Sequence, residues 1–128
     1  MFSTDPTILL TALRDAIDAG AGPGILLIYT VPQPDPGAEI TDQTLLAALA
    51  FNDPCGVVAD GALTLSINED GSADDTGIAA WARITDSEGV WVADMDCGNE
   101  ASAAALKLNS VQIVEGGTVD ISSAVITA

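Results

Sequence analysis

Carboxylates are the most abundant groups in this chain that could do chemistry, and their densest cluster is the stretch Asn68–Asp75. Carboxylate and amide oxygens at short spacing are the ligands that calcium prefers. The EF-hand spacing fails, because no glutamate stands at the twelfth position from Asn68 or Asp70. The stretch is more typical of a turn whose Asp and Asn side chains bond nearby backbone groups. The weak calcium candidates are Asn68, Asp70, Asp74 and Asp75.

Asp94 and Asp96 form a second pair of acids, spaced so that both point to the same side of a strand. Paired carboxylates can act as acid and base in glycoside hydrolysis. A sugar-cleaving cleft usually needs aromatic side chains, and this chain has only two Trp, two Phe and one Tyr. We therefore expect two solvated acids on a strand face.

The absence of histidine removes Ser-His-Asp and Cys-His catalysis and every histidine-ligated metal site. Cys55 and Cys97 form no CxxC pair, and neither has a histidine or nearby cation to lower its pKa. Two small buried residues are expected, with a disulfide in an oxidising medium as the alternative. No phosphate-loop, zinc-protease or serine-hydrolase motif is present. The sequence predicts no enzyme, no cofactor and no metal.

Trp81, Arg83 and Trp91 flank a predicted hairpin turn at 86–89. If the flanking strands pair about the midpoint of that turn, the two tryptophans are near cross-strand neighbours. Such a pair beside an arginine can serve as a ligand platform or an interface hot spot. Sheet packing is its commoner role. The three residues are interface candidates.

The net charge of −16, from nineteen acidic and three basic residues, repels nucleic acid and anionic membrane surfaces. Apolar residues make up 48% of the chain and the mean hydropathy is +0.39, unlike a disordered acidic chain. No apolar run reaches the ~18 residues of a membrane span. The N-terminus lacks the basic start of a signal peptide, so we expect synthesis and folding in a cytosol.

One helix is predicted at about 6–19, at the start of a single domain spanning 1–128. Asp5 is a suitable N-cap, Pro6 suits the first helical position, and Gly20 ends the periodic pattern. The apolar stripe either packs on its own domain, which we favour, or contacts a neighbouring subunit. Its residues Leu9, Leu13 and Ile17 are therefore also interface candidates.

The rest of the domain, about 25–127, is predicted to be β-structure. The segment 45–51 suits a helix or a strand, and we favour a strand that ends at Asn52-Asp53-Pro54. The proline-rich stretch 30–41 predicts a stiff loop outside any sheet ladder. About seven strands at regular spacing indicate a sandwich or a barrel, and we predict an antiparallel β-sandwich. The expected strands are 25–31, 45–51, 62–67, 78–84, 90–93, 110–114 and 118–127.

Several segments resemble a family of small, mostly uncharacterised proteins of tailed phages and prophages. The resemblance rests on 74–84 with the following 86–89, on 106–109, on 116–119, and on the order of helix, glycine-rich turn and Ile28-Tyr29 strand. It covers most of the chain, and its motifs are structural. The longer proline loop departs from the pattern.

The resemblance implies a virion structural protein made in the host cytoplasm, and a capsid decoration or cement protein fits best. Its partners would be the major capsid protein or other virion subunits. A homo-oligomer is compatible with the sequence. The alternatives are a tail, neck or fibre-associated protein, or a carbohydrate- or calcium-binding β-sandwich module.

Overall fold

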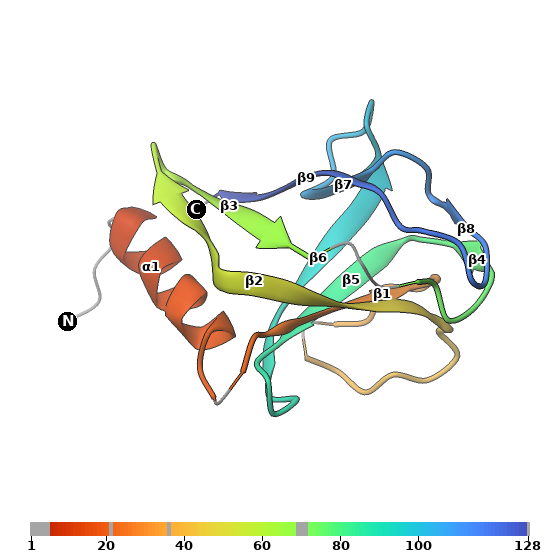
Figure 1. Cartoon of the computed structure of the whole chain (residues 1–128), viewed down its shortest axis with the longest axis horizontal. Coiled ribbons are helices and arrows are strands. Elements are labelled where there is room, and N and C mark those ends of the chain that lie inside the picture. The colour runs from red at the N-terminus through yellow and green to blue at the C-terminus, as the bar shows by residue number, and fades with distance from the viewer. Residues whose placement is uncertain (1–5, 21, 36, 69–71, 128) are drawn as a thin grey trace.

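The computed structural model describes residues 6–20, 22–35, 37–68 and 72–127 and is mainly β with one helix (Figure 1). The helix and the first strands are α1 (Pro6–Ile17), β1 (Ile25–Tyr29), β2 (Leu45–Ala59), β3 (Ala62–Ile67) and β4 (Gly77–Ile78). The remaining strands are β5 (Trp81–Thr85), β6 (Trp91–Asn99), β7 (Leu106–Leu108), β8 (Gln112–Ile113) and β9 (Ile121–Thr127).

Seven strands close into a barrel in the order β1-β2-β3-β9-β7-β6-β5, and the ring closes because β1 also pairs with β5. The barrel is mixed, since β6 and β7 are parallel while the other pairings are antiparallel. The prediction of an antiparallel sandwich is therefore wrong in its finer part, although the mainly β class is confirmed. Apolar alternation marks one buried face per strand in both architectures, so it does not reveal ring closure.

Strand β2 runs straight through the predicted stop at Asn52-Asp53-Pro54. Its first part pairs with β1 and its second part with β3, with a register irregularity between Phe51 and Gly56. A proline in a strand is tolerated at such a bulge because no ladder hydrogen bond is required there. Gly56 permits the close approach of β3, since a Cβ at this position would collide with the carbonyl oxygen of Thr64.

The predicted strand 78–84 is two strands. β4 leaves the barrel and pairs with β8 in a separate two-stranded sheet. The chain then crosses over, with the Ala80 amide donating to the Tyr29 carbonyl oxygen at 3.0 Å, and β5 enters the barrel wall. Strand β7 was not predicted as a strand of its own, and β8 and β9 are shorter than expected.

The barrel interior is filled mainly by aliphatic side chains. Leu26 and Ile28 of β1 lie opposite Ile84 and Ala82 of β5, and all four are fully buried. The other large aliphatic side chains of the core that are fully buried include Leu46, Leu49, Leu63, Leu106 and Leu108.

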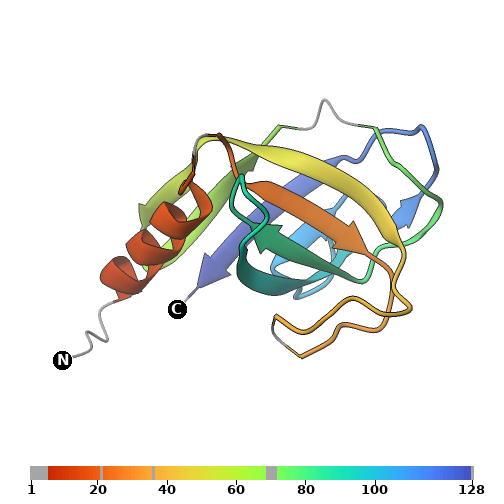
Figure 2. The ribbon, with the colours of Figure 1, turned by 90° about the horizontal axis from the view of Figure 1, so that it is seen from below.

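Helix α1 lies against β2 and β3 at one side of the barrel, which confirms that its apolar stripe packs on its own domain (Figures 1 and 2). Leu10 and Ile17 are buried in the common core, and Leu13 packs at its margin. Just beyond the helix, the Asp18 carboxylate accepts a hydrogen bond from the Cys55 amide at 3.2 Å. The predicted cap Asp5 lies outside the described residues.

Candidate functional site

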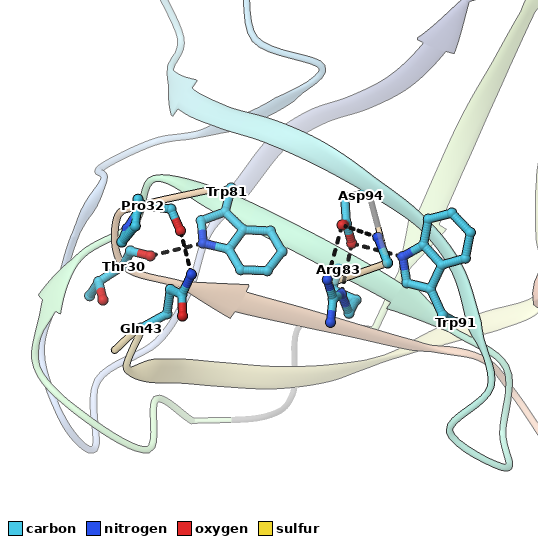
Figure 3. A network of polar contacts seen from close by, with 8 residues as sticks. Thr30, Pro32, Gln43, Trp81, Arg83, Trp91 and Asp94 are labelled. Carbon is cyan, nitrogen blue, oxygen red and sulfur yellow. Dashed lines mark hydrogen bonds and ion pairs between the residues drawn. The ribbon is translucent and has the colours of Figure 1, made fainter. Parts of the chain in front are cut away.

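The outer face of β5 is covered, so every residue of this strand is buried. Ala82 and Ile84 face the barrel interior, and Trp81, Arg83 and Thr85 alternate with them on the outside. The proline-rich loop between β1 and β2 folds back over this outer face (Figure 3). The tryptophan–arginine group of the sequence therefore lies between the barrel wall and the loop.

Arg83 and Asp94 form a two-pronged ion pair at the centre of this covered face. Arg83 Nε donates to Asp94 Oδ1 at 2.8 Å, and Arg83 Nη2 donates to Asp94 Oδ2 at 3.1 Å. Only 1% of the Asp94 side chain and 11% of the Arg83 side chain are exposed. Asp94 also accepts hydrogen bonds from the Gly37 amide and the Trp91 indole N–H.

The pKa values of the pair move in the directions that keep both groups charged. Burial alone would raise the pKa of Asp94, but the hydrogen bonds from Arg83, Gly37 and Trp91 outweigh it and hold that pKa below its ordinary value. The hydrogen bond to Asp94 raises the pKa of Arg83. The expectation of two solvated acids is therefore wrong for Asp94, whereas Asp96 is exposed.

Trp81 and Trp91 are not cross-strand neighbours, and this part of the prediction is wrong. Trp81 lies opposite Asp96, and Trp91 lies opposite Thr85, next to a register shift in the β5–β6 pairing. The extra residue places Trp91 on the same face as Asp94 despite their spacing of three. Its indole N–H donates to Asp94 Oδ1 at 3.0 Å.

Trp81 anchors the start of the loop. Its ring stacks on Tyr29 with centroids 4.9 Å apart, and the Arg83 guanidinium lies 5.3 Å from the ring centroid. The indole N–H donates to the Thr30 carbonyl oxygen at 2.8 Å, while Gln43 Nε2 donates to the Pro32 carbonyl oxygen at 2.6 Å (Figure 3). These contacts make Trp81 a packing residue of the domain.

Loop 30–44 is thus held to the barrel at Thr30 by Trp81 of β5 and at Gly37 by Asp94 of β6. Both charges of the ion pair are neutralised and nearly inaccessible, so this cluster offers no free carboxylate, base or nucleophile to a substrate. The sequence contained one signal for the clamp, because an arginine and an aspartate stood on either side of a predicted hairpin turn.

Both cysteines are free thiols. Burial, reinforced by the Asp18 carboxylate, raises the pKa of Cys55 to about 12. Burial also raises the pKa of Cys97 to about 12, with a further contribution from Asp96. A thiol that stays protonated at neutral pH is a poor nucleophile and a poor metal ligand.

The calcium candidates are only partly described, since Asp70 lies outside the described residues. Asp74 and Asp75 are exposed, and the Asp75 carboxylate accepts a hydrogen bond from the neighbouring Thr76 amide at 2.8 Å. In the described part of the chain, no three His, Cys, Asp or Glu side chains come together as a metal site would require.

The three interface candidates on helix α1 differ in how far their side chains are exposed. Ile17 is fully buried against the barrel, Leu13 is half-buried, and 49% of Leu9 is exposed. Trp91 is also exposed, at 42%, although its N–H is bonded to Asp94. Leu9 and Trp91 are therefore the interface candidates whose apolar surface remains accessible in the single chain.

A groove with a volume of about 730 Å³ opens where the barrel wall is incomplete, and sequence reasoning missed it. Strand β6 pairs with β7 only from Cys97 onward, so among the described residues its first half has no strand neighbour on the side away from β5. We call this opening the β6 groove. It is lined by Leu13, Gln33, residues 93–96 and 103–105, Lys107, Ser123, Val125 and Ile126.

The rest of the surface is dominated by acid. Among the residues whose exposure is described, every Asp and Glu is exposed except Asp18, Asp86 and Asp94. In these same parts of the chain, no helix has the length and apolar character needed to cross a membrane. The chain forms a small acidic barrel with a loop clamped to its wall. No protein-family model, curated protein or solved structure matches it.

Proposed function

We propose that this protein is a structural component of a tailed-phage virion, and that it is a decoration or cement protein on the capsid exterior. The observation that carries the proposal is the resemblance of segments 74–89, 106–109 and 116–119 to the phage family. Within a virion, DNA fills the capsid, and a subunit of charge −16 is repelled from that lumen.

The covered and neutralised Arg83–Asp94 pair also supports a role in binding rather than catalysis. Its interactions hold a loop against the barrel and leave neither charge of the pair open to a substrate. A cement protein has to bridge capsid subunits through apolar area and edge-strand contacts. The accessible apolar side chains Leu9 and Trp91 and the β6 groove are the surfaces of this chain suited to such contacts.

The experiment is a mass-spectrometric copy count in gradient-purified particles of the phage that encodes the chain, calibrated against the major capsid protein. We expect hundreds of copies per particle, as icosahedral decoration requires. About six to a few dozen copies would place the chain in the tail, neck or fibres instead. Absence from washed particles would refute the virion role.

A further inference from the structure

The β6 groove combines an apolar floor with an unpaired strand edge. Ala93 and Met95 lie opposite Ile84 and Ala82, so their side chains belong to the inner face of the wall. Across the opening, Val125 and Ile126 of β9 line the other side. These side chains form an apolar strip along the floor, beside polar lining from Gln33, Asp96, Lys107 and Ser123.

The backbone hydrogen bonds between β5 and β6 show which backbone groups of β6 are left free. The Cys97 amide donates to the Ala80 carbonyl oxygen at 3.2 Å, so Cys97 is bonded toward β5. Because these bonds alternate along an antiparallel strand, Met95 and Ala93 are bonded the same way, and the backbone groups of Asp94 point into the groove. In the described residues, no strand pairs with this edge before Cys97.

Lys107 is the basic side chain that lines the groove. Of the three basic residues, Arg14 pairs with Asp15 at 3.5 Å and Arg83 pairs with Asp94. The Lys107 ammonium has neither a hydrogen bond nor an ion pair among the residues that the structure describes. The groove's exposed acid, Asp96, already accepts a hydrogen bond from the Ala105 amide at 2.8 Å. Lys107 is thus the charged side chain of the groove lining that has no polar partner among the described residues.

We propose that the β6 groove binds an extended segment of a partner polypeptide, which adds as a strand to the free edge of β6 and places a carboxylate beside Lys107. An extended segment meets the three features together: its backbone pairs with the Asp94 edge, alternate apolar side chains enter the floor, and its acid neutralises the lysine. A second copy of this chain is a poor occupant, since each copy carries −16. The proposal goes beyond the virion role and does not depend on it.

The probe is a blocked seven-residue peptide of alternating valine and threonine with one central glutamate, long enough to span residues 91–96 at about 3.3 Å per residue. We expect titration to shift the amide NMR signals of Asp94, Asp96 and Lys107 and to slow exchange of the Asp94 amide. The same peptide with lysine in place of glutamate should bind more weakly. A version N-methylated at the pairing positions should not bind, because it cannot donate to the strand edge.

Lys107→Glu should weaken binding of the glutamate peptide about two- to fivefold, the range expected for one partly exposed ion pair. Arg14→Glu makes the same change in net charge outside the groove and should alter affinity less than twofold. Lys107→Gln serves if the glutamate variant does not fold. The proposal is overturned if the peptide leaves these signals unmoved at several millimolar, if both charge variants weaken binding equally, if the N-methylated peptide binds as well, or if sedimentation shows the groove occupied by a second copy.

Discussion

Replacing Asp94 with asparagine tests whether the buried ion pair holds the loop to the barrel. Asp94 accepts four hydrogen bonds, two at each oxygen. Asparagine keeps one acceptor oxygen, which can retain the bonds from Arg83 Nε and Trp91 Nε1. Its NH₂ group would then face two donors, Arg83 Nη2 and the Gly37 amide, and both would lose their acceptor.

The orphaned Arg83 donor is buried and costs about 1–3 kcal/mol, whereas Gly37 is exposed, so water can satisfy its amide at little cost. We expect Asp94→Asn to lower the free energy of unfolding by about 3 kcal/mol in total. For a domain of 128 residues this corresponds to a fall in Tm of about 12 °C. Circular dichroism during thermal unfolding measures the loss, and Trp91 fluorescence reports release of the loop.

Asp96→Asn is the matched control, because Asp96 lies on the same face of β6 but is exposed and accepts one bond, from the Ala105 amide. Its cost should stay below about 0.5 kcal/mol. The double variant Arg83→Met with Asp94→Leu should recover much of the lost stability, since no buried charge is left unpaired.

Lowering the pH should remove the difference in unfolding free energy between the wild type and Asp94→Asn. The pKa of Asp94 is lower in the folded chain than in the unfolded one, so its contribution is complete above the ordinary value of about 3.9 and is lost as the pH falls through the folded value. The gap in unfolding free energy should be constant above about pH 5 and should shrink below about pH 4. Equal losses for the Asp94 and Asp96 variants, or a gap unchanged in acid, would refute this account.

Three further outcomes are expected. Gly56→Ala should lower the free energy of unfolding, measured in urea, by at least about 2 kcal/mol, because the added Cβ would collide with the Thr64 carbonyl oxygen. Gly22→Ala is the control, since the nearest atom to its added Cβ is 3.7 Å away, and it should change the free energy of unfolding by less than about 0.5 kcal/mol. Similar losses for the two variants would contradict the clash. At pH 8, Cys97 should react with a thiol reagent about a thousandfold more slowly in the folded chain than in urea, because burial raises its pKa to about 12, and equal rates would contradict that environment. Gln43→Ala should shift Trp81 fluorescence to the red by loosening the Pro32 contact, and an unchanged spectrum would show that Gln43 does not hold the loop.

Local patterns predicted the helices, strands and turns well where the signal lies in residues that are adjacent in the sequence. The strand 62–67 and the helix start at Pro6 agree with the structure. The turn at 86–89 is confirmed by the bond from the Gly89 amide to the Asp86 carbonyl oxygen and by the positive φ of Gly89. These features depend on neighbours in sequence, so their causes are visible in the chain itself.

Pairings between distant residues could not be predicted in the same way. The register shift between Ile84 and Thr85 moves Trp91 to the face of Asp94, and a strict alternation places it on the other. The burial of Asp94 depends on the loop amide of Gly37, which is far away in sequence. The β6 groove depends on where β7 stops pairing, and no residue type in β6 signals that point.

Ring closure has a consequence for the order in which this protein folds. The hairpin β5–β6 forms from adjacent segments, but the β1–β5 pairing joins Ile25 to Thr85, and the β3–β9 pairing joins Ala62 to Thr127. Closing loops of this length costs conformational entropy before the closing contacts can form. The barrel should therefore fold more slowly than a helical domain of equal size, and its intermediates expose unpaired strand edges to other nascent chains. The rate of barrel closure therefore sets how long these strand edges stay exposed during folding.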